Sequence, residues 1–144
     1  MNIRKALPDD AKEIYALEYE VFANDPFCLS LGSIRYHIKN NELYVAQIDD
    51  AIISYALFLK RKRGYRLYSL VTKKEFQKRG IARKLLTFFI NTFDFELITL
   101  EVKIKNREAI ALYETLGFKE KRILKDFYDD CDGILMELQK ELPI

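Results

Sequence analysis

The sequence has little of what marks several protein classes. Its 144 residues include two cysteines, three prolines, five glycines, a single histidine and no tryptophan. Cys28 and Cys131 stand far apart, without the Cys-x-x-Cys or Cys/His spacing of a zinc site or a disulfide framework. We therefore expect two reduced thiols and no metal site. His37 is expected to cap or decorate a surface helix rather than to catalyse.

Long apolar runs, linkers and an excess of one charge are also missing. The run Ala51 to Leu59 falls well short of the ~20 residues that cross a bilayer, so no membrane helix is expected. No Pro/Gly/Ser-rich linker interrupts the chain, which predicts one domain over residues 1–144. The 24 Lys and Arg nearly balance the 22 Asp and Glu, which argues against a nucleic-acid binder. The polar start, which leads into Pro8, predicts a cytoplasmic protein without a secretory signal.

The sequence does contain a core-forming composition, with 49% hydrophobic and 13% aromatic residues. Runs of strand period and of helix period alternate along it. Asp49 and Asp50 separate the 43–48 and 51–59 runs, which predicts a hairpin with a tight acidic turn. Both faces of the 51–59 run are apolar, so this strand is expected inside the sheet. The fold class is therefore α/β (α+β), with a mixed sheet and helices on both faces. Strands are expected at 2–6, 43–48, 51–59, 65–72, 96–102, 118–124 and 134–138, and helices at 9–22, 33–39, from 81 up to Phe93, and at 106–116. The basic run 60–64 is expected to turn the chain, and Ala109, Leu112 and Leu116 are expected as core positions of the last helix.

The segment after the 65–72 strand carries the clearest local pattern, Gln77-x-x-Gly80-x-Ala82 before a long helix. Small residues let a ligand approach the backbone, and unpaired amides at a helix N-terminus favour an anion. This arrangement suits a pyrophosphate. The alternative is a turn glycine before a core helix, with the basic residues as a solvated face. The basic residues concerned are Lys78, Arg79, Arg83 and Lys84.

A second group of polar residues comprises Glu101, at the end of the 96–102 strand, and Asn106 and Tyr113 on the next helix. Asn106, Ile110 and Tyr113 share one helical stripe, and Glu101 can approach the same region. We therefore expect a carboxylate, an amide and a phenol to converge. In the alternative interpretation Glu101 faces water, Asn106 is only an N-cap and Tyr113 is a core tyrosine.

The second group lies within the run Leu100-Glu101-Val102-x-x-x-Asn106-x-x-Ala109-x-x-Leu112-Tyr113-x-x-x-Gly117-Phe118. This run, the Gln77-x-x-Gly80-x-Ala82 loop and the order of elements closely resemble the GCN5-related N-acetyltransferases (GNAT). The run from Leu100 to Phe118 is most similar to the bacterial ribosomal-protein N-terminal acetyltransferase branch. The resemblance implies a mostly antiparallel sheet of about seven strands, with a splayed strand pair that binds CoA. It also implies acetyl-CoA as cosubstrate and direct attack by an amine.

The resemblance further implies roles for particular residues. Glu101 matches the general base of that branch, Tyr113 matches the usual general acid, and Asn106 matches a position that contacts the coenzyme. Backbone groups near three strand residues match those that hold the pantetheine arm and polarise the thioester carbonyl. These strand residues are Leu70, Val71 and Thr72, and the loop positions that match the pyrophosphate site are Gln77, Lys78, Arg79, Gly80, Ile81, Ala82 and Arg83.

The acceptor is less defined than the coenzyme site. The stretch from Phe22 to Ser33 is expected to line the acceptor site, with Asp25 and Phe27 as candidates. Tyr128 is a further candidate, because the family branch carries paired tyrosines in the region that matches the 125–133 segment and this chain has one there. The acidic residues of that segment either attract a cationic acceptor or form a solvated turn. The leading prediction is acetyl transfer to the N-terminal α-amine of a protein or peptide, by a monomer or a homodimer. The alternatives are a small amine (polyamine, amino acid or aminoglycoside) and a non-catalytic acyl-CoA-binding module.

Overall fold

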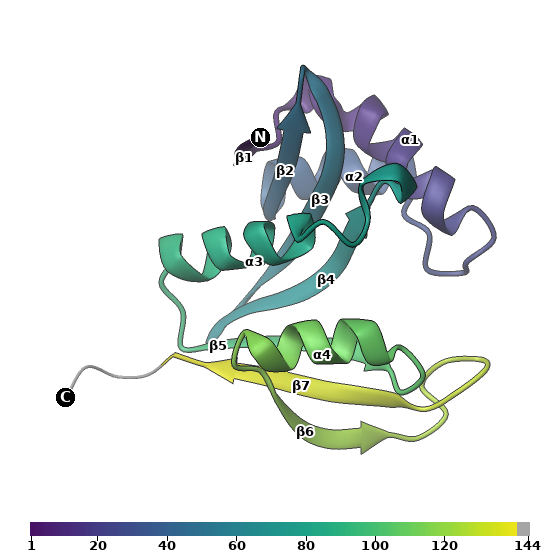
Figure 1. Ribbon diagram of the computed structural model, residues 1–144, viewed down its shortest axis with the longest axis vertical. Coiled ribbons are helices and arrows are strands. Elements are labelled where there is room, and N and C mark those ends of the chain that lie inside the picture. Colours follow the sequence, from purple (N-terminus) through teal and green to yellow (C-terminus); the bar gives the residue numbers. More distant parts are fainter. Residues whose placement is uncertain (141–144) are drawn as a thin grey trace. The chain divides into compact units, whose positions relative to one another are not determined.

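A computed structural model describes residues 1–140, and its elements follow the predicted order (Figure 1). The strands are β1 (Asn2–Lys5), β2 (Glu42–Ile48), β3 (Ala51–Arg61), β4 (Gly64–Thr72), β5 (Leu97–Lys103), β6 (Lys119–Leu124) and β7 (Gly133–Gln139). The helices are α1 (Ala11–Phe22), α2 (Leu31–Asn40), α3 (Ile81–Thr92) and α4 (Arg107–Thr115), with short 3-10 turns η1 (Pro8–Asp10) and η2 (Lys74–Phe76). No helix among these residues is both long and apolar enough to cross a membrane.

The strands form a mixed sheet in the order β1-β2-β3-β4-β5-β7-β6. The β4–β5 pair is parallel, whereas β1–β2, β2–β3, β5–β7 and β6–β7 are antiparallel. The predicted fold class is confirmed, and β3 is an internal strand as expected. The chain divides into two compact units, one of residues 1–60 and 69–93, the other of residues 61–68 and the chain from Asp94 onwards. β4 contributes to both units.

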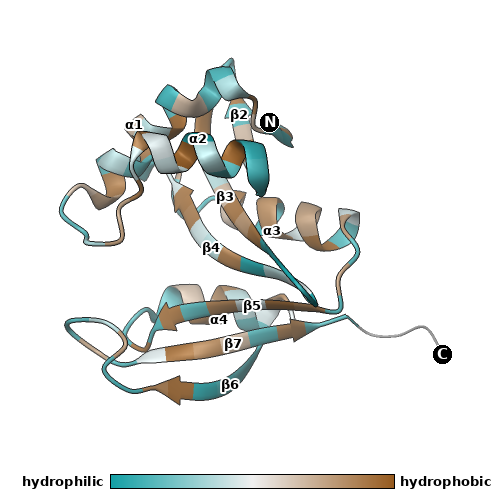
Figure 2. Ribbon diagram, turned by 180° about the vertical axis from the view of Figure 1, so that it is seen from behind, coloured by the Kyte–Doolittle hydropathy of each residue, from teal (hydrophilic) through white to brown (hydrophobic). Residues whose placement is uncertain are grey.

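Helices cover both faces of the sheet in the first unit. On one face, α3 places Phe89 against Phe58, with stacked ring centroids 3.6 Å apart, and Phe89 also stacks on Phe93 at 4.3 Å. On the other face, α1 and α2 pack against β2 and β3, and the apolar colour of β3 is visible in Figure 2. The core of this second face includes Ile14, Leu17, Ile34, Ile38, Leu43, Val45 and Leu57.

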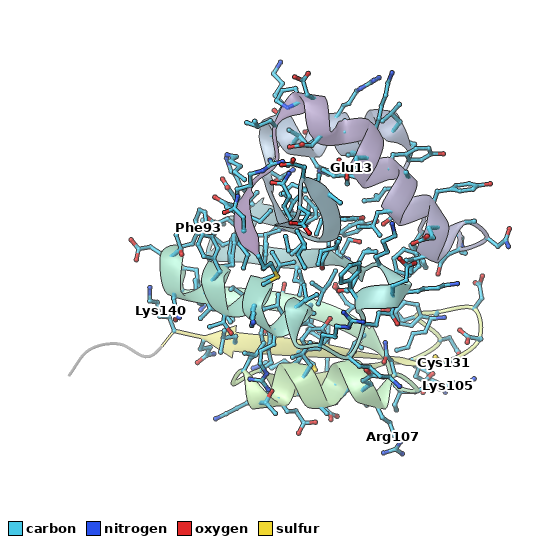
Figure 3. The ribbon with its side chains drawn as sticks, turned by 45° about the horizontal axis from the view of Figure 1, so that its top comes forward. Glu13, Phe93, Lys105, Arg107, Cys131 and Lys140 are labelled. Carbon is cyan, nitrogen blue, oxygen red and sulfur yellow. The ribbon has the colours of Figure 1, made fainter. Side chains whose placement is uncertain are left out.

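The hairpin between β2 and β3 turns on two acidic residues, as predicted. Asp49 and Asp50 have φ angles of 49° and 66°, the left-handed pair that a type I′ turn requires. Aspartate tolerates this conformation better than most residues because its short polar side chain can bond locally. Beside the turn, Glu13 of α1 (Figure 3) accepts a 2.7 Å hydrogen bond from the N–H of Ile52. This bond ties the first helix to the start of β3.

The second unit places α4 on the β5–β7–β6 part of the sheet. The structure corrects two details of the prediction here. The basic run after Leu59 is not a turn throughout, because β3 continues to Arg61. Ala109, Leu112 and Leu116 were expected in the core of the 106–116 helix, but they are only half-buried, and Tyr113 is the buried residue of α4.

Candidate active site

Only the first part of β4 pairs with β5. The parallel register pairs Gly64–Leu67 with Leu97–Leu100, whereas β4 continues to Thr72. Residues 68–72 therefore lie beyond this register, as a splayed strand pair requires. Backbone N–H and C=O groups on an edge outside a ladder are available to a ligand that lies along the strand.

The direction of these backbone groups alternates along β4. The C=O of Val71 accepts a 2.7 Å bond from Ser54 Oγ, and the N–H of Lys73 donates to β3 at 2.8 Å. Because successive strand residues turn their backbone groups to opposite edges, those of Leu70 and Thr72 point away from β3. Val71 is thereby corrected as a source of the polarising N–H, since its backbone faces β3 and its side chain is buried. Leu70 and Thr72 remain.

The predicted pyrophosphate loop leads into α3 without a side-chain cap. Gly80 is the N-cap residue at φ 77°, and Lys78 also has a positive φ of 63°. The first helical bond runs from the N–H of Lys84 to the Gly80 carbonyl at 3.1 Å. The side chain of Gln77 donates to the Thr72 carbonyl at 3.0 Å and so holds the loop against the end of β4. The amides of Ile81 and Ala82 precede the first helical bond and can face an anion.

Glu101 of β5 forms an ion pair that the sequence did not reveal. Its Oε2 lies 3.0 Å from Nε of Arg66 on β4, and the Glu101 side chain is 18% exposed. The Arg66 guanidinium also lies over the ring of Tyr68, 5.2 Å from the ring centroid. The ion pair with Arg66 therefore fixes the position of the Glu101 carboxylate, which does not simply face solvent. Arg66 is distant in sequence, and only the parallel register of β4 and β5 brings it near.

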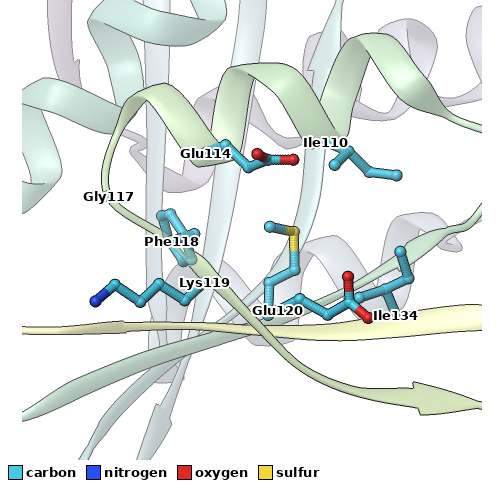
Figure 4. A pocket seen from close by; sticks show the side chains of 8 residues that line it. Ile110, Glu114, Gly117, Phe118, Lys119, Glu120 and Ile134 are labelled. Atoms are coloured by element: carbon cyan, nitrogen blue, oxygen red, sulfur yellow. The ribbon is translucent and has the colours of Figure 1, made fainter.

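The face on which Glu101 lies follows from the strand register. The buried residues on either side of it in β5 pair with Ile134 and Met136 of β7, whereas Glu101 pairs with Leu135. Ile134 and Met136 line a pocket of about 370 Å³ together with Ile110 and Glu114 of α4 (Figure 4). Side chains alternate between the faces of a sheet, so Glu101 lies on the face opposite α4. The pocket itself holds none of the predicted catalytic residues.

Tyr113 lies on the α4 side of the same strands and is nearly buried, with 8% exposure. Its ring centroid is 5.8 Å from that of Phe118, and its hydroxyl has no hydrogen-bond partner among residues 1–140. Burial, with a smaller effect of the Tyr128 phenol, raises the pKa of Tyr113 to about 12. The phenol is thus fully protonated at neutral pH. Glu101 and Tyr113 lie on opposite faces of the β5–β7 pair, so the two side chains do not meet each other and can approach a common ligand only from opposite sides.

Asn106 begins α4. Its Oδ1 accepts a 3.2 Å bond from the N–H of Ala109, so it is the N-cap of the helix. The residues on either side of Asn106 are the exposed Lys105 and Arg107, both labelled in Figure 3. Capping uses the oxygen of the Asn106 amide only. Its NH₂ group therefore remains available for a second contact.

The two acceptor candidates in the 23–30 loop lie in a local turn. Asp25 Oδ1 accepts a 2.8 Å bond from the N–H of Phe27, and the Asp25 carbonyl accepts from the N–H of Cys28 at 3.0 Å. The Phe27 side chain is 54% exposed. This loop connects α1 to α2 in the first unit.

The acidic 125–133 segment is occupied by its own contacts. Asp130 pairs with Lys103 at 3.2 Å, and the hydrogen bond from this ammonium lowers the pKa of Asp130. Asp132 accepts a 2.8 Å bond from the N–H of Asp126. The Lys103 ammonium also lies over the Tyr128 ring, 5.4 Å from its centroid. These contacts favour the solvated-turn interpretation over an acidic binding surface.

Comparison with known proteins agrees with this geometry. Residues 39–120 match the family model of an acetyltransferase (GNAT) domain, and the chain belongs to this family. It is 34% identical to an N-alpha-acetyltransferase of Saccharolobus solfataricus over 69% of this chain and 71% of that protein. It is 32% identical to the [ribosomal protein bS18]-alanine N-acetyltransferase of Salmonella typhimurium over 67% of each.

A solved structure has the same fold. The ribosomal-protein-S18-alanine N-acetyltransferase from Escherichia coli superposes with a TM-score of 0.87 at 23% identity, covering 99% of this chain and 96% of that one. The resemblance to the GNAT superfamily and to its ribosomal-protein branch is confirmed. The chain is thus a GNAT-type acetyltransferase, a family that uses acetyl-CoA as cosubstrate. Within residues 1–140 no group of three or more His, Cys, Asp or Glu is arranged to hold a metal ion.

Proposed function

We propose that this chain transfers the acetyl group of acetyl-CoA to the N-terminal α-amine of a protein or peptide. The observation that carries this proposal is the division between Glu101 and Tyr113, on opposite faces of the β5–β7 pair. Acetyl transfer to an amine needs a proton acceptor beside the amine and a proton donor beside the sulfur. The two relatives described above, one an N-alpha-acetyltransferase and one an alanine N-acetyltransferase, support the α-amine.

In this proposal, backbone groups of two segments contact the coenzyme: the edge of β4 and the start of α3. The edge of β4 at Leu70 and Thr72 would hold the pantetheine arm, and one of their N–H groups would polarise the thioester carbonyl. The uncapped amides at the start of α3 would hold the pyrophosphate. The family model runs from residue 39 to 120 and so includes residues of both compact units. We therefore treat residues 1–144 as one catalytic domain.

The reaction divides between the two side chains. The amine arrives mainly as ammonium, with a pKa of ~8 for an N-terminus, and Glu101 removes a proton directly or through water. The neutral nitrogen attacks the thioester carbonyl, a C–N bond forms, and the oxyanion is stabilised by the β4 amide. The C–S bond then breaks, and the thiolate takes a proton from Tyr113. No covalent enzyme intermediate is needed, so neither cysteine is a nucleophile.

The test is a thiol-release assay with acetyl-CoA and a panel of acceptors. The panel contains peptides with a free N-terminal alanine, serine or methionine, the same peptides with a blocked N-terminus, and polyamines, amino acids and aminoglycosides. The proposal expects turnover of free peptides and none of blocked ones. Turnover of small amines alone would establish the small-molecule alternative. Thermal stabilisation by CoA without turnover of any acceptor would establish the binding module.

Two matched pairs of variants test the catalytic assignment. Glu101→Gln should lose most turnover, whereas Glu96→Gln removes a similar Arg–Glu ion pair, Arg63–Glu96, and should not. Tyr113→Phe should lose turnover, whereas Tyr36→Phe, at an exposed tyrosine of α2, should not. Full activity of Glu101→Gln would contradict its role as the base.

A further inference from the structure

A buried carboxylate in the first unit takes no part in the chemistry above. Glu18 of α1 is 1% exposed and lies in the apolar core that α1 and α2 share with the sheet. A carboxylate in such a place is costly unless hydrogen bonds compensate for the water that it has lost. Both of its oxygens have partners. Hydrogen bonds are directional, so they fix the positions of the groups bonded to Glu18 more narrowly than apolar packing would.

The two partners of Glu18 come from different elements. Its Oε2 accepts a 2.7 Å bond from the backbone N–H of Leu29, and its Oε1 accepts a bond from the hydroxyl of Tyr55. The same hydroxyl is 3.2 Å from Ser69 Oγ. Tyr55 lies on β3 and is completely buried. One connected group of polar atoms thus runs from α1 through β3 to β4.

The two ends of this polar group, Leu29 and Ser69, lie next to proposed substrate-binding segments. Leu29 lies near the end of the 23–30 loop, which carries the acceptor candidates Asp25 and Phe27. Ser69 directly precedes Leu70, whose backbone points away from β3 and toward the proposed thioester site. Other bonds within the loop include those at Asp25 and a long one of 3.9 Å from Cys28 Sγ to the Leu29 carbonyl. Glu18 therefore connects the loop to the strand that is proposed to hold the acetyl group.

We propose that Glu18 and Tyr55 are positioning residues that hold the 23–30 loop in the conformation that binds the acceptor amine. This inference rests on the proposed function for its kinetic consequence. Glu18 touches neither substrate, and its effect passes through the Leu29 amide. The coenzyme contacts proposed at the start of α3 and along β4 are made by backbone groups that Glu18 does not touch. Loss of Glu18 therefore weakens binding of the acceptor and leaves binding of acetyl-CoA unchanged.

The test compares Glu18→Leu, which fills the core but accepts no hydrogen bond, with Glu18→Gln, whose amide can accept from Leu29 and donate to Tyr55. Tyr55→Phe removes one hydroxyl and provides a milder variant should Glu18→Leu fail to fold. The control is Glu42→Leu, at a second buried carboxylate, which pairs with Lys5 at 3.6 Å on the β1–β2 pair. The measurements are hydrogen exchange of residues 23–30, and KM for acetyl-CoA and for a peptide with a free N-terminal alanine.

For Glu18→Leu we expect exchange of the loop amides to rise about tenfold and KM for the peptide about fivefold or more, from the loss of a charge-assisted hydrogen bond. KM for acetyl-CoA should stay within about twofold, and Glu18→Gln should restore both changed quantities. Glu42→Leu should change neither. Unchanged peptide KM in Glu18→Leu, or an equal rise in Glu42→Leu, would overturn the inference.

The exchange measurement separates this inference from the proposed function. If wild-type protein does not acetylate the peptide, the α-amine proposal fails, and the loop measurement is unaffected. Loop exchange in Glu18→Leu or Tyr55→Phe that equals the wild-type rate would then overturn the positioning role by itself.

Discussion

Replacing Tyr113 with phenylalanine removes one hydroxyl from the core of the second unit and should separate catalysis from stability. The hydroxyl has no hydrogen-bond partner among residues 1–140, and the ring contact with Phe118 is kept. The free energy of unfolding at neutral pH should therefore change by less than about 1 kcal/mol. A positioned proton donor contributes roughly 10²–10⁴-fold, so kcat should fall by about this factor while KM for acetyl-CoA stays the same.

The raised pKa of Tyr113 adds a second signature at alkaline pH. Its ordinary value is 10.0, and burial raises it to about 12 in the folded protein. Below pH 10 the phenol is protonated in both states, and its contribution to stability is fully present. Between pH 10 and about 12 the unfolded chain loses the proton and the folded protein keeps it, so stability falls, by about 3 kcal/mol in total. Tyr113→Phe should lack this part of the fall.

Two assays check these expectations, each with Tyr36→Phe as the control. Thiol release at saturating acetyl-CoA measures kcat, and urea unfolding across the pH range measures stability. A kcat of Tyr113→Phe within about threefold of wild type would refute its role as the general acid. An equally steep alkaline loss of stability in Tyr113→Phe and wild type would show that the phenol is less desolvated than its 8% exposure indicates.

Three further perturbations test other parts of the structure. Arg66→Met leaves the half-buried carboxylate of Glu101 without its 3.0 Å partner, and kcat should fall about tenfold or more in the thiol-release assay because the base is no longer held; unchanged kcat would make this ion pair irrelevant to the reaction. Phe89→Ala removes a completely buried ring that stacks on two others, and urea unfolding should show a loss of about 3–5 kcal/mol. Gly64→Ala would place Cβ 2.0 Å from a β5 carbonyl oxygen at φ 155° and should cost about 3 kcal/mol or more. Its control, Gly32→Ala in α2, meets no atom within 4 Å and should be neutral or stabilising by about 1 kcal/mol, and similar effects of the two would contradict the close approach.

Most elements could be predicted from the sequence because their signals are local. The acidic turn at Asp49 and Asp50, the long apolar run of β3 and the glycine before α3 each act through neighbouring residues. The helix ends were less accurate, since Asn106 was taken as the first helical residue and is instead the N-cap of α4. Frayed and capped ends depend on individual side-chain bonds, which periodicity does not resolve.

The spacing of Asn106, Ile110 and Tyr113 predicted one stripe, but it contained no information on the face of β5 that α4 covers. That face depends on the register of β5 with β7, which pairs Glu101 with Leu135. A shift of one residue would have moved Glu101 to the opposite face. The separation of the carboxylate from the phenol was therefore beyond any argument from spacing.

The sequence by itself determined the family, the order of elements and the residue types that could carry acetyl transfer, because these depend on local pattern. The tertiary structure decided which groups those residues meet. It pairs Glu101 with Arg66, buries Tyr113, turns the backbone of Val71 toward β3 and connects Glu18 to Tyr55. Each of these contacts joins segments distant in sequence, and strand register and helix packing, which arise only from the folding of the whole chain, bring them together.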